Sequence, residues 1–169
     1  MSLPAPTGTP YRIGFVCLGN ICRSPMADVI LSELLDGAGL GKSVEVTSCG
    51  TGGWHIGHPM DPRAATQLLA SGYDASAHRA QQFDTDWLGR DLLLAMDAKN
   101  LADLLAAGGQ EERVRLFRSF DPLAPPNPGP EDLDVPDPYY GGDDNFVEVI
   151  GMVERTCRSI LEELGALHL

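Results

Sequence analysis

The segment from Tyr11 to Asp28, YRIGFVCLGNICRSPMAD, restricts the fold of this chain more than any other stretch. An apolar run leads into Cys17, five residues separate Cys17 from Arg23, and a helical pattern follows from Ser24. This order predicts a buried strand, a tight loop and the N-terminus of a helix. Loop amides at such a junction form a concavity that binds anions.

The side chains of this loop suit a bound phosphate that is attacked by a thiol. Gly19 lets the backbone approach a ligand closely, and Asn20 tolerates a left-handed conformation. Arg23 offers a planar fork that can bind two phosphate oxygens. The same positive field stabilises the thiolate form of Cys17, to which Ser24 can donate a hydrogen bond. We therefore predict that Cys17 is a nucleophile. The alternative is a buried structural cysteine followed by a helix that happens to contain Arg23.

A second segment supplies the proton that the leaving alkoxide or phenoxide needs. Asp137 is the best candidate, because prolines on both sides fix the backbone that carries it. The alternative is an ordinary Asp-Pro turn, as Asp121-Pro122 could be. The adjacent Tyr139 and Tyr140 favour Asp137, since two tyrosines can wall a slot for phosphotyrosine.

Composition limits the class of protein and its partners. The length of 169 residues and the hydrophobic fraction of 43% fit one globular domain. The net charge of −12 disfavours nucleic acid and anionic membranes as partners. We expect residues 1–10, which are rich in Pro and Thr, to form a disordered tail, and residues 11–169 to form a single phosphatase domain.

Location is also predicted from simple patterns. The N-terminus has neither a basic region nor an apolar core typical of a secretory signal, and no apolar stretch reaches the ~20 residues of a membrane span. These patterns predict a cytoplasmic protein, with export by a non-classical route left open. A monomer is expected.

Strands and helices are predicted to alternate along the chain. Strands are expected at 11–17, 44–49, 91–96 and 113–117, and helices at 24–36, 61–70, 99–107 and from about Asn145 onward. Asn145 and Glu148 fit a variant of the capping box at the last helix. This order predicts a three-layer α/β/α sandwich with a central four-stranded parallel sheet, Rossmann-like. Ligands bind such folds at the carboxyl ends of the strands, where Cys17 and Asp97 are expected.

Several motifs together resemble the low-molecular-weight protein tyrosine phosphatases, and most closely their actinobacterial branch. The segment 16–25, VCLGNICRSP, resembles the family signature, and 137–141, DPYYG, resembles its general-acid motif. Family patterns also match the segments TGGWHIG (51–57), DPRA (61–64) and SAHRA (76–80). The similarity covers residues 11 to about 165.

The resemblance implies a role for each matching residue. Cys17 would form a phosphocysteine, Arg23 would bind the phosphoryl group, and Asp137 would protonate the leaving group and then activate water. Other positions are implied as a set: Leu18, Gly19, Asn20, Ile21, Cys22 and Ser24 in the substrate loop, Ser48 and His78 as supports, and Trp54, Tyr139 and Tyr140 as the aromatic walls. No metal or organic cofactor is implied, and the partner would be a phosphotyrosine-containing protein.

Other cysteines and histidines are given weaker roles. Cys22 lies in the same loop as Cys17, and the family resemblance supports a reversible disulfide between them that protects the nucleophile; simple packing under the loop is the alternative. Cys49 and Cys157 are expected to be small buried hydrophobes. His55 and His58 lack further metal ligands nearby and are expected on the surface. For Asp97, a brace for the site and a cap for the next helix remain equally open.

Three competing functions are weighed against phosphotyrosine hydrolysis. Arsenate reduction in a related lineage needs a close pair of further cysteines, whereas Cys49 and Cys157 are far apart in sequence. Protein-arginine phosphatases of the superfamily carry Thr where this chain has Ile21 and Phe where it has Tyr139. A phosphotyrosine-binding module without catalysis would need neither the thiolate nor the acid.

Overall fold

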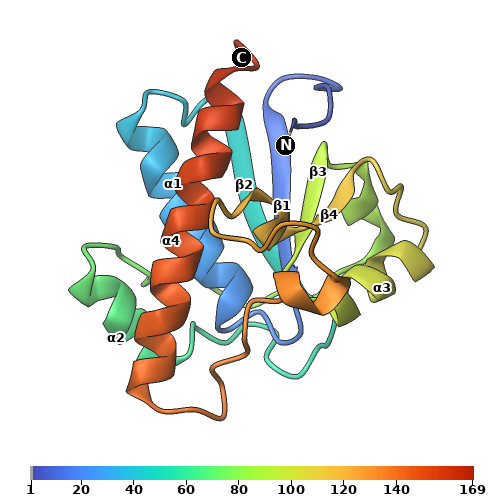
Figure 1. The fold of residues 1–169 in the computed structure, drawn as a ribbon. Helices are drawn as coiled ribbons and strands as arrows, with labels where there is room; N and C mark the ends of the chain where they lie inside the picture. Colours follow the sequence, from blue (N-terminus) through green and yellow to red (C-terminus); the bar gives the residue numbers. More distant parts are fainter. Residues whose placement is uncertain (1) are drawn as a thin grey trace.

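A four-stranded parallel sheet forms the centre of the molecule, which a computed structural model describes for residues 2–169 (Figure 1). The strands are β1 (Tyr11–Cys17), β2 (Val44–Gly50), β3 (Leu92–Ala95) and β4 (Val114–Leu116), in the spatial order β2-β1-β3-β4. All neighbouring strands are parallel, and Cys17 pairs with Gly50 at the carboxyl ends of β1 and β2. This arrangement brings the ends of three sequence-distant strands to one edge.

Helices cover both faces of the sheet. The α-helices are α1 (Arg23–Gly37), α2 (Pro62–Ala70), α3 (Ala98–Ala106) and α4 (Asp143–Gly165), and short 3-10 helices span Thr85–Gly89, Phe117–Phe120 and Pro130–Leu133. Leu92 and Leu94 of β3 pack into the cluster under α1 and α4, whereas Leu93 and Ala95 pack into the cluster under α3. Figure 1 shows α1, α2 and α4 on one side of the sheet and α3 on the other. The predicted three-layer α/β/α sandwich is confirmed.

The start of α4 differs from the sequence prediction. The helix begins at Asp143, with Gly142 as an extended N-cap residue, so Asn145 lies inside the first turn. The predicted capping box of Asn145 and Glu148 is therefore wrong. Asp143 and Asp144 stand in the first turn instead, where carboxylates interact favourably with the helix dipole.

Residues 2–10 contain no helix or strand, yet they lie against the body of the protein. The Tyr11 hydroxyl donates to the Pro4 carbonyl at 2.9 Å, and the backbone N–H and hydroxyl of Thr7 both donate to Asp91 at 2.8 Å. Leu3 is buried. This packing differs from the disorder that the Pro/Thr-rich composition indicates, because the buried Asp91 carboxylate supplies hydrogen-bond partners that a local sequence pattern cannot show. Residue 1 of this tail lies outside the described residues.

Within the described chain, no helix is both long and apolar enough to cross a membrane.

Candidate active site

The loop after β1 is pressed against the end of β2. A Cβ at Gly50 would stand 2.7 Å from the Leu18 carbonyl oxygen and 3.1 Å from the Asn20 nitrogen. Only glycine leaves room for the loop backbone at this crossing, so Gly50 permits the close approach. The loop therefore turns back over the sheet edge directly after Cys17.

The carbonyl groups and the N–H groups of the loop differ in their hydrogen-bond partners. Loop carbonyls accept hydrogen bonds from outside the loop, namely those of Cys17, Leu18 and Ile21 from backbone N–H groups between residues 51 and 61, and that of Asn20 from His78. Among the described residues, the N–H groups of residues 19–22 donate to no protein group. They are therefore available to a bound anion, as the predicted anion concavity requires.

Asn20 holds the loop in shape from its centre. Its φ of 56° places it in the left-handed region, as its residue type allows. The side-chain NH₂ donates to Ser24 Oγ at 2.8 Å and to Ser48 Oγ at 3.0 Å, and the side-chain oxygen accepts from the Gln81 N–H at 3.0 Å. Ser24 Oγ lies 2.9 Å from Cys17 Sγ. The structure thus brings together the predicted supports of the loop and adds Gln81, which sequence reasoning missed.

His78 completes this network from the far side of the loop. Its Nε2 lies 2.7 Å from the Asn20 carbonyl oxygen, so this nitrogen must carry a proton and donate. Burial lowers the pKa of His78, only partly offset by that hydrogen bond. The ring is therefore neutral at physiological pH and acts as a fixed donor.

Arg23 is held between two segments that are far apart in sequence. Its Nη1 donates to Asp97 Oδ2 at 2.7 Å and to the Val135 carbonyl at 3.0 Å, and the side chain is only 4% exposed. Burial lowers the pKa of Arg23, but the neighbouring negative groups, Cys17 and Asp97 first among them, raise it overall. Asp97 Oδ1 also accepts from the Asn100 N–H at 2.7 Å, so both roles left open for Asp97 are present in one side chain.

Asp137 faces Arg23 across the opening of the site. Its Oδ2 lies 3.6 Å from Arg23 Nη2, and its Oδ1 accepts from the Tyr139 N–H at 3.1 Å. Val135, two residues earlier, pairs with the end of β3 through its N–H and the Met96 carbonyl at 2.7 Å. The carboxylate is thereby placed near the thiol loop from a segment more than one hundred residues downstream.

Arg63, at the start of α2, anchors the segment that follows Asp137, and sequence reasoning gave it no role. Its Nη2 donates to the Tyr139 carbonyl at 2.7 Å and its Nη1 to the Gly141 carbonyl at 3.0 Å. Asp61 holds the guanidinium through both carboxylate oxygens, and the Asp61 N–H donates to the Ile21 carbonyl of the loop. These two residues therefore connect the thiol loop with the acid segment. The match of residues 61–64 to the family pattern DPRA was the sequence signal that could have pointed to Arg63.

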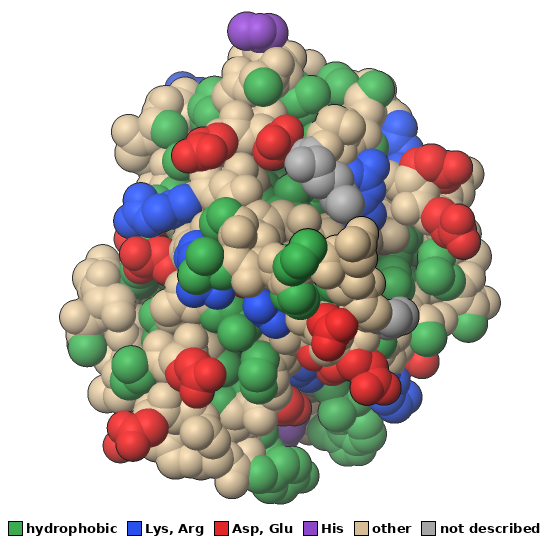
Figure 2. Space-filling model, viewed as in Figure 1, with side chains coloured by type: hydrophobic (Ala, Val, Ile, Leu, Met, Phe, Trp, Pro, Cys, Tyr) green, Lys and Arg blue, Asp and Glu red, His purple; other side chains and the backbone are tan. Residues whose placement is uncertain are grey.

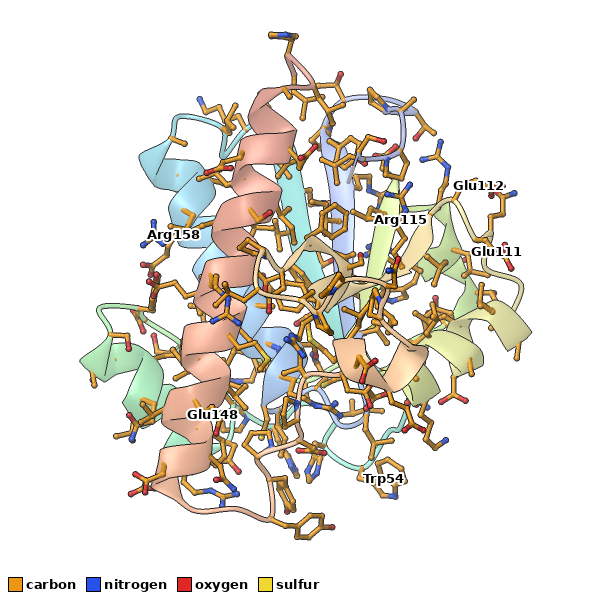
Figure 3. The ribbon with its side chains drawn as sticks, in the orientation of Figure 1. Trp54, Glu111, Glu112, Arg115, Glu148 and Arg158 are labelled. Atoms are coloured by element: carbon orange, nitrogen blue, oxygen red, sulfur yellow. The ribbon has the colours of Figure 1, made fainter. Side chains whose placement is uncertain are left out.

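A cavity of about 400 Å³ opens above the thiol. Its floor is made by the loop and Arg23, and its walls by Trp54, His55, Asp137, Tyr139 and Tyr140. Figure 2 shows the molecule hollowed at its lower edge between two groups of hydrophobic side chains, and Figure 3 places Trp54 beside this opening. The rings of Tyr139 and Tyr140 meet edge to face at 4.9 Å between centroids. The predicted aromatic residues thus line one cavity, and His55 joins them although it was expected on the surface.

The remaining cysteines, Cys22, Cys49 and Cys157, are buried. All four cysteines are free thiols, and Cys22 also lines the cavity. Burial raises the pKa of Cys22, Cys49 and Cys157.

Among residues 2–169, no group of three or more His, Cys, Asp or Glu side chains is arranged to hold a metal ion.

Comparison with known proteins places the chain in a family. The model of the family "Low molecular weight phosphotyrosine protein phosphatase" matches residues 12–167. The chain belongs to this family. The low molecular weight protein-tyrosine-phosphatase of Streptomyces coelicolor is 47% identical over 155 residues, which cover 89% of this chain and 92% of that protein. This relative confirms the predicted resemblance to actinobacterial phosphatases.

Two further relatives extend the likeness to this phosphatase family. Low molecular weight protein-tyrosine phosphatase A of Mycobacterium tuberculosis is 48% identical over 145 residues, covering 86% of each chain. The crystal structure of YfkJ from Bacillus subtilis shares 32% identity and a TM-score of 0.83, covering 95% of this chain and 98% of that one. The family is one of hydrolases, so the prediction that the chain is an enzyme is confirmed.

Proposed function

We propose that the protein hydrolyses phosphotyrosine in protein substrates through a phosphocysteine intermediate. The observation that carries this proposal is the placement of Cys17 at the floor of a cavity that has unpaired loop amides around it. Arg23 stands at the same floor and Asp137 at the opening. A phosphate bound by the amides and Arg23 would present its phosphorus to the thiolate, with its ester oxygen directed toward the carboxyl group.

The first chemical step transfers the phosphoryl group to sulfur. The Cys17 thiolate attacks phosphorus, a P–S bond forms, and the P–O bond to the phenol breaks. Asp137, in its protonated form, gives its proton to the departing phenolate. Ser24 Oγ, at 2.9 Å from the sulfur, can donate to the thiolate before attack and again when the sulfur leaves.

The second step returns the enzyme to its starting state. A water molecule attacks the phosphocysteine, and the ionised Asp137 accepts the proton of that water. The P–S bond breaks, inorganic phosphate leaves, and Cys17 is again a thiolate. We propose that this cycle needs no metal or organic cofactor, and that residues 11–169 carry it out as a single domain and a monomer in the cytoplasm.

The walls of the cavity support an aryl substrate over the competing ones. Trp54, His55 and the two tyrosines surround the opening, and flat aromatic walls suit the ring of phosphotyrosine. Arsenate reduction is disfavoured because Cys49 and Cys157 lie in different hydrophobic clusters and neither lines the cavity. Ile21 lines the cavity at the position where the resemblance implies Thr in protein-arginine phosphatases. This difference disfavours phosphoarginine as the substrate.

Hydrolysis of phosphotyrosine peptides tests the proposal, with phosphoserine peptide, phosphoarginine and arsenate as competing substrates. We expect turnover of phosphotyrosine and its loss in Cys17→Ser. Asp137→Ala should lower kcat by roughly 10²–10⁴ for phosphotyrosine and by less for p-nitrophenyl phosphate, whose leaving group needs little protonation. Asp144→Ala, at an exposed aspartate outside the cavity, is the matched control. Turnover of phosphoarginine or arsenate without phosphotyrosine would contradict the proposal, and peptide binding without turnover would favour the binding module.

We also propose that Cys22 protects the nucleophile. Peroxide would oxidise the Cys17 thiolate to a sulfenic acid, and the Cys22 thiol would then displace water to form a disulfide. The position of Cys22 in the same cavity supports this, whereas its burial fits the alternative of simple packing. Mass spectrometry after mild peroxide should find the Cys17–Cys22 disulfide. Sulfinic acid at Cys17 without that disulfide would rule the proposal out.

A further inference from the structure

A second hollow lies directly beside the catalytic cavity. A groove of about 330 Å³ runs between the segment 51–54 and α3, and it shares two walls, Leu18 and Trp54, with the cavity. Both shared side chains are exposed, Leu18 by 40% and Trp54 by 69%. The two side chains therefore form a ridge with the cavity on one side and the groove on the other.

The ridge is fixed in place by its surroundings. The Gly52 N–H donates to the Leu18 carbonyl at 2.9 Å, and the Thr51 N–H donates to the Cys17 carbonyl at 2.9 Å. The indole of Trp54 packs over Gly52 so closely that a Cβ at Gly52 would overlap the ring. Figure 3 shows the Trp54 side chain projecting from the ribbon at the lower end of the molecule. A large apolar ring that is exposed to solvent and packed against Gly52 is suited to contact a ligand. Its exposed surface contributes nothing to the stability of the fold.

The groove combines an apolar floor with a charged rim. The half-buried Phe83 supplies apolar surface above the fully buried Leu104, and Ala107, at the end of α3, supplies a small exposed side chain. Lys99 and Asp103 stand on the rim, where their charged atoms lie 3.7 Å apart and both side chains are exposed. An exposed pair at this distance adds little to stability, so Lys99 is free to pair with a carboxylate of a ligand instead.

We propose that this groove binds a large apolar side chain that flanks the phosphotyrosine of a peptide substrate; this rests on the proposed function. With the phosphotyrosine ring in the cavity, an extended peptide advances about 3.3 Å per residue, so a neighbouring side chain within two positions can cross the ridge. The continuity of the groove with the cavity favours this occupant, because any peptide that leaves the cavity past Trp54 must lie over it. The substrate class is therefore a protein phosphotyrosine with an adjacent apolar residue.

Peptide substrates that differ at one flanking position test this groove. Each peptide carries one phosphotyrosine, and one position from −2 to +2 is Ala, Leu or Phe. We expect Leu or Phe at one of these positions to raise kcat/KM about tenfold over Ala, as burial of such a side chain allows. The activity toward p-nitrophenyl phosphate, which ends inside the cavity, measures the catalytic machinery alone.

A matched pair of variants tests the location. Ala107→Arg places a long side chain into the groove, and a cation at a helix C-terminus is well tolerated. It should abolish the gain from Leu or Phe while leaving p-nitrophenyl phosphate hydrolysis unchanged. Ala106→Arg, one position earlier on an exposed site that does not line the groove, should keep the gain.

Each contrary outcome has a distinct meaning. Equal kcat/KM for all peptides, or a gain that survives in Ala107→Arg, overturns the groove proposal while the phosphatase function stands. A change of oligomeric state in Ala107→Arg, seen by size-exclusion chromatography, would make the groove an interface between copies of this chain and also overturn it. No turnover of p-nitrophenyl phosphate by the wild type would refute the proposed function itself, and the groove proposal with it.

Discussion

At the residue scale, the surroundings of Asp28 change its acidity. It lies on α1 behind the thiol loop, and burial raises its pKa to about 6, although hydrogen bonds from Ser48 and Ser32 lower it in part. Ser48 Oγ in turn accepts from the Asn20 side chain, which donates also to Ser24. The half-buried Asp28 carboxylate thus stands at the end of the hydrogen-bonded chain that begins at the Cys17 sulfur.

Asp28→Asn should therefore change how stability depends on pH. The folded-state pKa is raised, so the ionised carboxylate costs free energy above pH 6, and this cost disappears as the pH falls toward 4. Relative to the wild type, the variant should gain about 2.4 kcal/mol in free energy of unfolding between pH 4 and pH 8. Urea unfolding at both pH values measures this gain. Asp36→Asn, at an exposed aspartate of the same helix, is the control, and an equal pH dependence in Asp28→Asn and the wild type would contradict the argument.

At the element scale, the N-terminus of α2 joins the two halves of the site. Asp61 is the N-cap residue of α2 and accepts from the Arg63 N–H at 2.8 Å. The hydrogen bonds that Arg63 makes lower the pKa of Asp61, although burial raises it. The Arg63 guanidinium also lies over the Phe146 ring, 4.7 Å from its centroid, so α4 supports it as well. Arg63 is in this sense a positioning residue for Asp137.

Arg63→Ala should weaken proton donation more than phosphate binding. Without the bonds to the Tyr139 and Gly141 carbonyls, the Asp137 segment loses two anchors, so kcat for phosphotyrosine should fall about tenfold. Hydrolysis of p-nitrophenyl phosphate should fall much less, because its leaving group depends little on the acid. Arg63→Lys should restore little, because one ammonium cannot reproduce the planar fork.

Arg79→Ala serves as the control, since Arg79 donates to carbonyls of its own segment, at Ser76 and His78. Steady-state kinetics with both substrates gives the comparison. Equal losses for the two substrates would show that Arg63 acts on the whole site instead of on the acid segment.

At the scale of the whole molecule, one ion-paired cluster fixes the long connection between β4 and α4. Asp121 accepts from Arg155 of α4 at 2.7 and 2.8 Å and from Arg118 at 3.0 Å. The side chain of Asp121 is fully buried. These bonds, that from Arg155 first, lower the pKa of Asp121 to about 2 against the opposing effect of burial. The segment that carries Asp137 is thus attached to the longest helix before it reaches the active site.

Asp121→Asn should lower the free energy of unfolding by about 2 kcal/mol at pH 7. Because the folded-state pKa is depressed, this contribution is present above pH 4 and is lost as the pH falls through 2. The difference between variant and wild type should therefore shrink to roughly half near pH 3 in urea unfolding. Glu131→Gln, at an exposed acid of the same connection, is the control, and a difference that does not vary with pH would contradict this account.

Sequence reasoning recovered the parts of the structure that depend on neighbours along the chain. The four parallel strands, the helix that begins beside Arg23 and the helix that begins next to Asp61 all follow from local periodicity and turn chemistry. It erred where a local pattern competed with packing. Asn145 and Glu148 fit a capping box in the sequence, yet α4 begins two residues earlier at Asp143, with Gly142 as its N-cap residue.

The sequence by itself determined the chemical groups and the order of elements: a thiol and an arginine on one loop, a carboxyl group between prolines, and alternating strands and helices. Tertiary structure alone decided which distant groups complete them. Asp97 and the Val135 carbonyl orient Arg23, Arg63 anchors the segment of Asp137, and Trp54 separates the cavity from the groove. Spacing along the chain encodes local geometry, whereas contacts between segments arise only when parallel strands bring their carboxyl ends to one edge.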